Sequence, residues 1–164
     1  MSSTDTYVAN AERYAASFDK GDLPLPPAKG TAVVACMDAR LSPYGILGLS
    51  EGDSHVIRNA GGVVTDDVIR SLAISQRLLG TTEIVLIHHT GCGMLTFTDD
   101  ELRGSIEADT GVRPDWAAEA FTDVDQDLVQ SIRRIRADPA IPHTGDVRGF
   151  VYEVETGRLR EVKA

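Results

Sequence analysis

Short apolar runs alternate with amphipathic segments along this chain, and the alternation predicts its secondary structure. The runs 31–36 and 83–88 are short and rich in β-branched residues, which is typical of buried strands. A shorter strand is expected at 55–58. From Thr65 to Gly80, apolar residues recur at helical spacing and the first turn carries two acidic residues, which predicts a helix that ends at the glycine.

The second half of the chain continues this alternation. Thr122 is expected to begin another helix, which ends before Pro139. The tail 147–162 predicts two strands joined by a turn at 155–158. Residues 94–120 are polar and predict only short helices and loops.

Strands that alternate with helices predict an α/β fold. We expect a mostly parallel central sheet of four strands with helices on both faces, joined by right-handed crossovers. The C-terminal hairpin is expected to add an antiparallel edge strand. In sheets of this kind, ligands bind beyond the carboxyl ends of the strands.

The N-terminus predicts a helical arm, residues 1–29, ahead of a main domain, residues 30–164. Apolar residues follow Thr4 at i, i+3, i+4 spacing, which predicts an amphipathic helix that ends at Gly21. Three prolines within 23–27 then keep the backbone extended. We expect the arm to mediate dimerisation through its apolar face; packing against its own domain is the alternative.

Composition narrows the class of protein. With 164 residues, 42% hydrophobic and 25% charged, the chain is expected to fold as one globular domain. A formal net charge of −9 argues against a nucleic-acid partner, which needs a basic surface. Apolar runs stay well short of the roughly 20 residues of a membrane helix, and the first residues lack the features of a secretory signal. We therefore expect a cytoplasmic protein with no membrane partner.

The two cysteines of the chain both lie near the ends of predicted strands and are candidate metal ligands. Cys36 ends the first apolar run, and His89 and Cys92 follow the run 83–88. If these strands are neighbours, two thiolates and an imidazole converge, and these groups suit Zn²⁺. Cytoplasmic cysteines are expected to be metal ligands or free thiols rather than a disulfide. Small buried free cysteines are the alternative.

A carboxylate and a guanidinium lie close to the first cysteine. Asp38 follows Cys36 by two residues, and Arg40 follows Asp38 by two. Asp38 is a candidate fourth ligand, and Arg40 is suited to hold its carboxylate in a bidentate fork. With Asp38 held back, the fourth position stays open for water; with Asp38 on the metal, the site is closed. A surface salt bridge is the alternative for this pair.

Together these residues form a two-part pattern with a glycine-containing loop between its parts. The segments Cys36-x-Asp38-x-Arg40 and His89-x-x-Cys92-Gly93, with Arg58-Asn59-Ala60-Gly61 between them, resemble the motifs of the β-class carbonic anhydrases. The likeness runs through residues 30–155 and is greatest to the short bacterial and archaeal branch.

The resemblance implies a catalytic domain over residues 30–164. It implies zinc bound by Cys36, His89 and Cys92, a catalytic pair of Asp38 and Arg40, and Asp38 as the fourth ligand in a closed state. It also implies homodimers that often pair into homotetramers.

The activity implied by the resemblance is that of a zinc lyase. Zinc-bound hydroxide would hydrate carbon dioxide reversibly to bicarbonate, so the partner is a small-molecule substrate. Hydrolysis of carbonyl sulfide or carbon disulfide at the same site is an alternative, because relatives of this branch resemble such hydrolases. Gly91 also departs from the acidic or polar residue that many relatives carry there. A non-catalytic zinc-binding module is the second alternative, against which Arg40 weighs, since a structural ligand gains little from an arginine latch.

Two residues are candidates for substrate contact. Gly93 permits close backbone approach to the site. Val64, with Val63, is expected to form an apolar wall for a linear, nonpolar substrate, and core packing is the alternative. The motif spacing selects His89 over His88, which is expected to be a packed neighbour or to contact a metal ligand.

Overall fold

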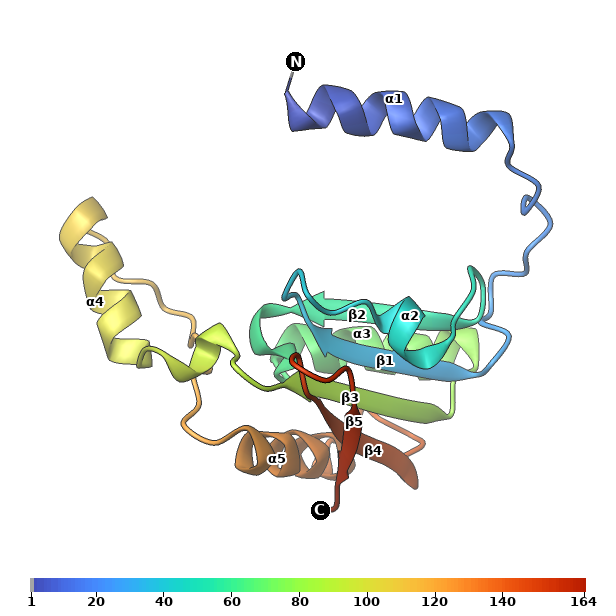
Figure 1. The fold of residues 1–164 in the computed structure, drawn as a ribbon. Helices are drawn as coiled ribbons and strands as arrows, with labels where there is room; N and C mark the ends of the chain where they lie inside the picture. Colours follow the sequence, from blue (N-terminus) through green and yellow to red (C-terminus); the bar gives the residue numbers. More distant parts are fainter. Residues whose placement is uncertain (1) are drawn as a thin grey trace.

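A computed structural model describes residues 2–164 as a five-stranded sheet in the order β2-β1-β3-β4-β5 (Figure 1). The first four strands in this order run parallel, and β5 pairs antiparallel with β4 at one edge. This arrangement confirms the predicted α/β sheet with its antiparallel edge strand. The strands are β1 (Thr31–Cys36), β2 (Ser54–Asn59), β3 (Glu83–His89), β4 (Asp146–Tyr152) and β5 (Leu159–Val162).

Helices cover the two faces of the sheet unequally. The long helices α3 (Asp66–Leu79) and α5 (Val124–Ala137) pack on one face, in a core that includes Leu72 and Leu86. The short helix α2 (Pro43–Leu47) packs in the core of the opposite face. Because successive side chains of a strand point to opposite faces, β1 and β3 contribute to both cores.

Local signals set the ends of the two long helices. The Thr65 side chain caps α3, and Gly80 ends it in the left-handed conformation, with φ 74°. Asp123 caps α5, one residue after the predicted start at Thr122, because its carboxylate accepts a hydrogen bond from the first turn. The sequence therefore located both helices, with a shift of one residue at one end.

Helix α4 (Asp99–Thr110) is longer than the polar sequence indicated. None of its residues is buried, so it has no apolar stripe strong enough to predict it. The signal that it does carry is a capping box. The Thr98 hydroxyl accepts from the Glu101 backbone, and the Glu101 carboxylate accepts from the Thr98 backbone.

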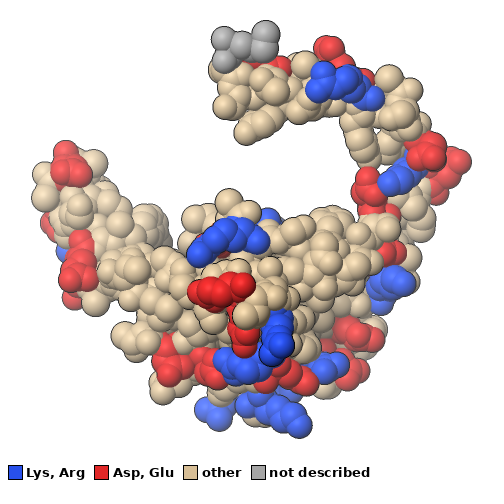
Figure 2. Space-filling model, in the orientation of Figure 1, with Lys and Arg blue, Asp and Glu red and all other residues tan. Residues whose placement is uncertain are grey.

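Helix α1 (Ser3–Ala16) stands away from the sheet and buries none of its residues (Figure 1). Tyr14 and Lys20 tie this arm to the body through hydrogen bonds to the Glu51 carboxylate. In Figure 2, the side of the arm that is turned toward the sheet carries few charged side chains. The alternative in which this helix packs against its own domain is therefore wrong. No helix within residues 2–164 has the length and apolar character needed to cross a bilayer.

The order of the strands brings the two halves of the sequence motif together. Strands β1 and β3 are neighbours, with Ala35 opposite Ile87, so their carboxyl ends open on the same edge of the sheet. Two 3₁₀ turns, η1 (Ala60–Gly62) and η2 (Gly93–Leu95), contact each other beside these ends. The candidate site lies in this position.

Candidate metal centre

Three candidate ligands converge at the carboxyl ends of β1 and β3. Cys36 is the last residue of β1, His89 is the last residue of β3, and Cys92 lies in the turn that follows. The two sulfur atoms and one imidazole nitrogen lie within 4.8 Å of one another, and all three residues are buried. Parallel pairing of the two strands thus assembles the cluster from distant parts of the chain.

Strand alternation determines which histidine belongs to this cluster. His88 and His89 are consecutive in β3, so their side chains point to opposite faces of the sheet. His89 points toward the cysteines, whereas the Nε2 atom of His88 lies 2.6 Å from a carboxylate oxygen of Asp127 on α5. The structure therefore supplies a physical reason for the choice that the motif spacing made.

The imidazole of His89 is arranged as a metal ligand. Its Nδ1 atom lies 2.9 Å from the Thr90 carbonyl oxygen, which can only accept, so Nδ1 carries the proton. The Nε2 atom then presents a lone pair, and it is buried without a hydrogen-bond partner among residues 2–164. A buried, unpartnered nitrogen beside two thiols fits a metal ligand. Two sulfurs and one imidazole nitrogen fit Zn²⁺, which takes four ligands.

The two thiols of the cluster differ in pKa, and the shifts have opposite directions. The hydrogen bond from Cys92 lowers the pKa of Cys36 against the effect of burial, and the backbone N–H groups of Asp38 and Gly61 act in the same direction. The contact with Cys36, together with burial, raises the pKa of Cys92. One thiolate is therefore favoured near neutral pH, while a second negative charge in this pair needs a cation beside it.

Asp38 and Arg40 form a bidentate pair next to the three ligands. The Arg40 Nε and Nη2 atoms lie 2.9 and 2.8 Å from the two carboxylate oxygens of Asp38, and the Arg40 backbone N–H donates to the same carboxylate. These hydrogen bonds hold the pKa of Asp38 well below its usual range. The Asp38 Oδ2 atom is also 3.7 Å from His89 Nε2, so the carboxylate adjoins the unpartnered nitrogen.

Comparison with known proteins identifies the family. The β-carbonic anhydrase 1 of Mycobacterium tuberculosis (strain ATCC 25618 / H37Rv) is 59% identical over 162 residues, which cover 99% of each chain. A family model described as carbonic anhydrase matches residues 31–134. The chain belongs to the β-carbonic anhydrase family.

Other similarities agree with this assignment. The crystal structure of carbonic anhydrase from Streptococcus mutans superposes with a TM-score of 0.92 at 43% identity and covers 99% of both chains. A carbon disulfide hydrolase from Acidianus sp. (strain A1-3) is 34% identical in an alignment that is 182 residues long and covers 96% of this chain and 87% of that protein. The predicted family, fold and enzyme class are thus confirmed.

Arg58 supports the site of this β-carbonic anhydrase in a way that sequence reasoning missed. Its Nε and Nη2 atoms donate to the Cys36 carbonyl oxygen at 3.0 and 2.8 Å, and Nη2 donates to the Asp38 carbonyl oxygen at 2.8 Å. The guanidinium therefore fixes the backbone between ligand and carboxylate. The motif includes this arginine, but spacing alone does not link a side chain of β2 to the carbonyl groups of the last residue of β1 and of Asp38.

Gly62 approaches the site more closely than any side chain would allow. It has φ 69°, and a Cβ atom there would lie 2.8 Å from the Cys36 backbone nitrogen and 3.1 Å from the Ile87 carbonyl oxygen. The backbone of turn η1 therefore lies in direct contact with the backbones of β1 and β3. The sequence showed a glycine-containing loop here, whereas this close backbone approach depends on the adjacency of β1 and β3.

A cavity of about 370 Å³ opens on the metal centre. Gly93 lines this cavity together with Met94 and Phe97, which places Gly93 where substrate contact was expected. Val64 is instead buried in the core beneath α3 and α5, while Val63 belongs to the core on the metal side. Core packing, the alternative expectation, therefore describes the position of Val64.

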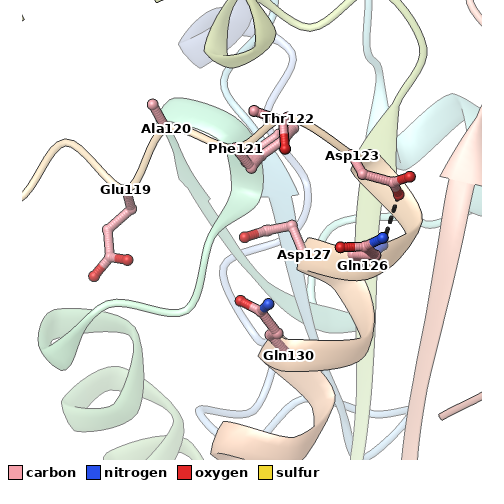
Figure 3. Close-up of a pocket in the computed structure, with 8 residues that line it drawn as sticks. All are labelled: Glu119, Ala120, Phe121, Thr122, Asp123, Gln126, Asp127 and Gln130. Atoms are coloured by element: carbon pink, nitrogen blue, oxygen red, sulfur yellow. Dashed lines mark hydrogen bonds between the residues drawn. The ribbon is translucent and has the colours of Figure 1, made fainter. Parts of the chain in front are cut away.

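A separate cavity of about 270 Å³ is formed by residues 119–123 and the first turns of α5 (Figure 3). Two of its wall residues, Phe121 and Asp127, contact His88 of β3. The Phe121 ring stacks on the His88 ring with centroids 5.7 Å apart, and Asp127 pairs with His88 Nε2. His88 thus packs against Phe121 and Asp127, on the face of the sheet opposite His89.

Proposed function

We propose that this chain catalyses the reversible hydration of carbon dioxide to bicarbonate, with zinc held by Cys36, His89 and Cys92. The observation that carries the proposal is the buried, unpartnered His89 Nε2 atom, which lies within 4.8 Å of both thiols and 3.7 Å from Asp38. Family membership at 59% identity to a β-carbonic anhydrase supports the same conclusion.

In the proposed reaction, Asp38 and Arg40 have different roles beside the metal. Zinc bound there supplies the Lewis acidity that lets water act as a nucleophile near neutral pH. The Asp38 carboxylate is ionised and lies next to the metal ligands, so it is suited to accept a hydrogen bond from the attacking water and orient it. Arg40 holds Asp38 through both oxygens and also donates to the Gly91 carbonyl oxygen at 3.1 Å. Release of this hold would let Asp38 become a fourth ligand and close the site.

Stopped-flow hydration assays on protein of measured zinc content test the proposal. We expect hydration by the zinc-loaded chain, with activity rising toward alkaline pH as the site opens. Asp38→Ala should keep its zinc and lose most of this activity. Hydration that is unchanged in zinc-loaded Asp38→Ala would show that Asp38 has no catalytic role.

Hydrolysis of carbon disulfide or carbonyl sulfide is the second candidate. The 34% identity to a carbon disulfide hydrolase favours it, although the higher identity is to a carbonic anhydrase. All these substrates are linear and uncharged, so the ligands alone do not discriminate among them. Release of sulfide from carbonyl sulfide, measured on the same zinc-loaded sample, decides between the activities.

The arm supports a further part of the proposal, that a second copy of the chain covers α1 in a homodimer or homotetramer. Tyr7, Val8 and Phe18 are at least half exposed on or just after this helix, and no residue of α1 is buried. Such an apolar surface gains stability when a partner covers it. Residues 1–29 then act as the dimerisation arm of the catalytic unit 30–164, which sedimentation of the full chain tests.

We also propose a cytoplasmic location, because a reducing compartment keeps both thiols free to bind metal.

A further inference from the structure

The turn between β4 and β5 reaches the carboxyl end of β3, beside the metal centre. In the parallel pairing of these two strands, His89 lies opposite Tyr152, the last residue of β4. The Thr90 backbone N–H donates to the Tyr152 carbonyl oxygen at 2.9 Å and so continues the pairing by one residue. Residues 153–158 then lead into β5. The turn therefore starts next to the strand end that carries the histidine ligand.

Every polar group of Thr90 has a hydrogen-bond partner. In addition to the backbone N–H, the Thr90 hydroxyl lies 3.1 Å from the Glu155 carboxylate and 3.1 Å from the Val154 backbone nitrogen. A carboxylate only accepts and a backbone N–H only donates, so the hydroxyl donates to Glu155 and accepts from Val154. The Thr90 carbonyl oxygen accepts from His89 Nδ1 at 2.9 Å. Thr90 thus joins the β4–β5 turn directly to the imidazole.

Thr90 also lies between two of the metal ligands in the chain. His89 precedes it, and Cys92 follows it by two residues. Gly91, with φ 61°, has no side chain that could anchor this segment, and its carbonyl oxygen accepts from Arg40 Nη2 at 3.1 Å. Thr90 therefore carries the only side chain between the two ligands, and that side chain is tied to a different part of the fold.

We propose that Thr90 is a positioning residue of the metal centre, held by the β4–β5 turn so that His89 and Cys92 face the same ion. The inference rests on the zinc site of the proposed function. The Thr90 carbonyl keeps the His89 proton on Nδ1 and orients the ring, which leaves Nε2 for the metal. The hydroxyl fixes the place of that carbonyl, because it ties the same residue to Val154 and Glu155. Loss of the hydroxyl should therefore weaken zinc binding without removing a ligand.

Zinc affinity, measured by competition with a fluorescent chelator, tests this proposal independently of the reaction. Thr90→Val removes the hydroxyl and nearly keeps the side-chain shape, whereas Thr90→Ser keeps the hydroxyl. Thr156→Val is the matched control in the same turn. The Thr156 hydroxyl also donates to a glutamate, Glu153, at 2.7 Å and accepts from the Arg158 backbone at 3.3 Å. Urea unfolding of the zinc-free variants reports any general loss of stability.

We expect Thr90→Val to bind zinc about 10- to 100-fold more weakly than the wild type, as is usual when a partner of a metal ligand is lost. Thr90→Ser and Thr156→Val should stay within about twofold of the wild type. Equal zinc affinity in Thr90→Val and Thr156→Val overturns the proposal. A loss in Thr90→Ser as large as in Thr90→Val also overturns it, because packing and not the hydroxyl would then be the cause.

A second pair of variants carries the test if zinc-free Thr90→Val does not fold. Glu155→Ala and Glu155→Gln remove the same charge, but the amide oxygen of glutamine still accepts from the Thr90 hydroxyl. We expect Glu155→Gln to bind zinc more tightly than Glu155→Ala, and equal affinity overturns the proposal. A zinc-loaded wild type without hydration activity rejects the proposed function instead and leaves these comparisons of zinc affinity valid.

Discussion

Arg40 grips both carboxylate oxygens of Asp38, and this contact keeps an ionised carboxylate beside the unpartnered nitrogen of His89. A carboxylate so close to a metal-binding position would itself be drawn to the metal. The Arg40 guanidinium is positively charged, as a metal ion is, and therefore competes with the metal for the Asp38 carboxylate. We propose that the balance between these two partners of Asp38 decides whether the site is open or closed.

Loss of this grip should close the site. We expect Arg40→Gln to lower carbon dioxide hydration about 10- to 100-fold while zinc content stays the same, because Asp38 is then free to bind the metal. Stopped-flow rates at measured zinc content check this. Arg70→Gln is the control, since Arg70 pairs with Asp67 on the exposed surface of α3. Full activity in zinc-loaded Arg40→Gln would contradict the role assigned to the grip.

The two consecutive histidines should behave differently when replaced. His89→Gln is expected to abolish stoichiometric zinc binding, because it removes the only imidazole in the cluster. His88→Gln should keep its zinc and lose about 1–3 kcal/mol of stability, since the buried His88 side chain loses its hydrogen bond to the partly buried Asp127. Metal analysis and urea unfolding separate the two effects. Zinc loss in His88→Gln together with retention in His89→Gln would reverse the assignment.

Gly62 provides a test of backbone packing at the metal centre. In Gly62→Ala the new Cβ atom would meet the backbone of Cys36 at 2.8 Å, so we expect at least about 2 kcal/mol of destabilisation and weaker zinc binding. Gly80→Ala is a matched control, because Gly80 has a similar φ of 74° with open space around its Cβ position. Unfolding with and without a chelator measures both effects. Equal losses in the two variants would mean that φ strain alone, without the close approach, accounts for the result.

Asp99 should make stability depend on pH. Burial acts to raise the pKa of Asp99, but hydrogen bonds from the backbones of Ala120, Glu119 and Ala118 outweigh it, and the pKa is lowered. A lowered carboxyl pKa stabilises the fold above the unfolded-chain value, near 4, and this contribution is lost as pH falls through the folded-state pKa. We therefore expect Asp99→Asn to cost about 1–3 kcal/mol at pH 7 and progressively less on acidification.

Urea unfolding across the acidic range checks this expectation. Asp100→Asn is the control, because the neighbouring Asp100 side chain is 89% exposed and pairs only with a surface arginine among the residues that the structure describes. A constant difference between wild type and Asp99→Asn at every pH would show that the carboxylate charge is not the source of the stability.

Sequence patterns were sufficient where the physical cause is local. Apolar runs located β1 and β3 to within a residue, and Thr65 and Gly80 marked both ends of α3, because capping and side-chain periodicity act over a few residues. Helix α4 was expected only as short helices and loops, because its residues bury no apolar face, although its capping box was present in the sequence.

Residue types and their spacing specify the chemistry of this chain: two thiols, an imidazole, a carboxylate and a guanidinium in a pattern that marks a known family. How these groups come together depends on the packing of whole elements. The pairing of β1 with β3 brings Cys36 to His89, strand alternation turns His88 away, and the close approach of Gly62 locks the turn against both strands. The hydrogen bonds of Arg58 to the Cys36 and Asp38 carbonyl oxygens also depend on contacts between distant segments. Such contacts follow from how whole elements pack, and local spacing does not encode them.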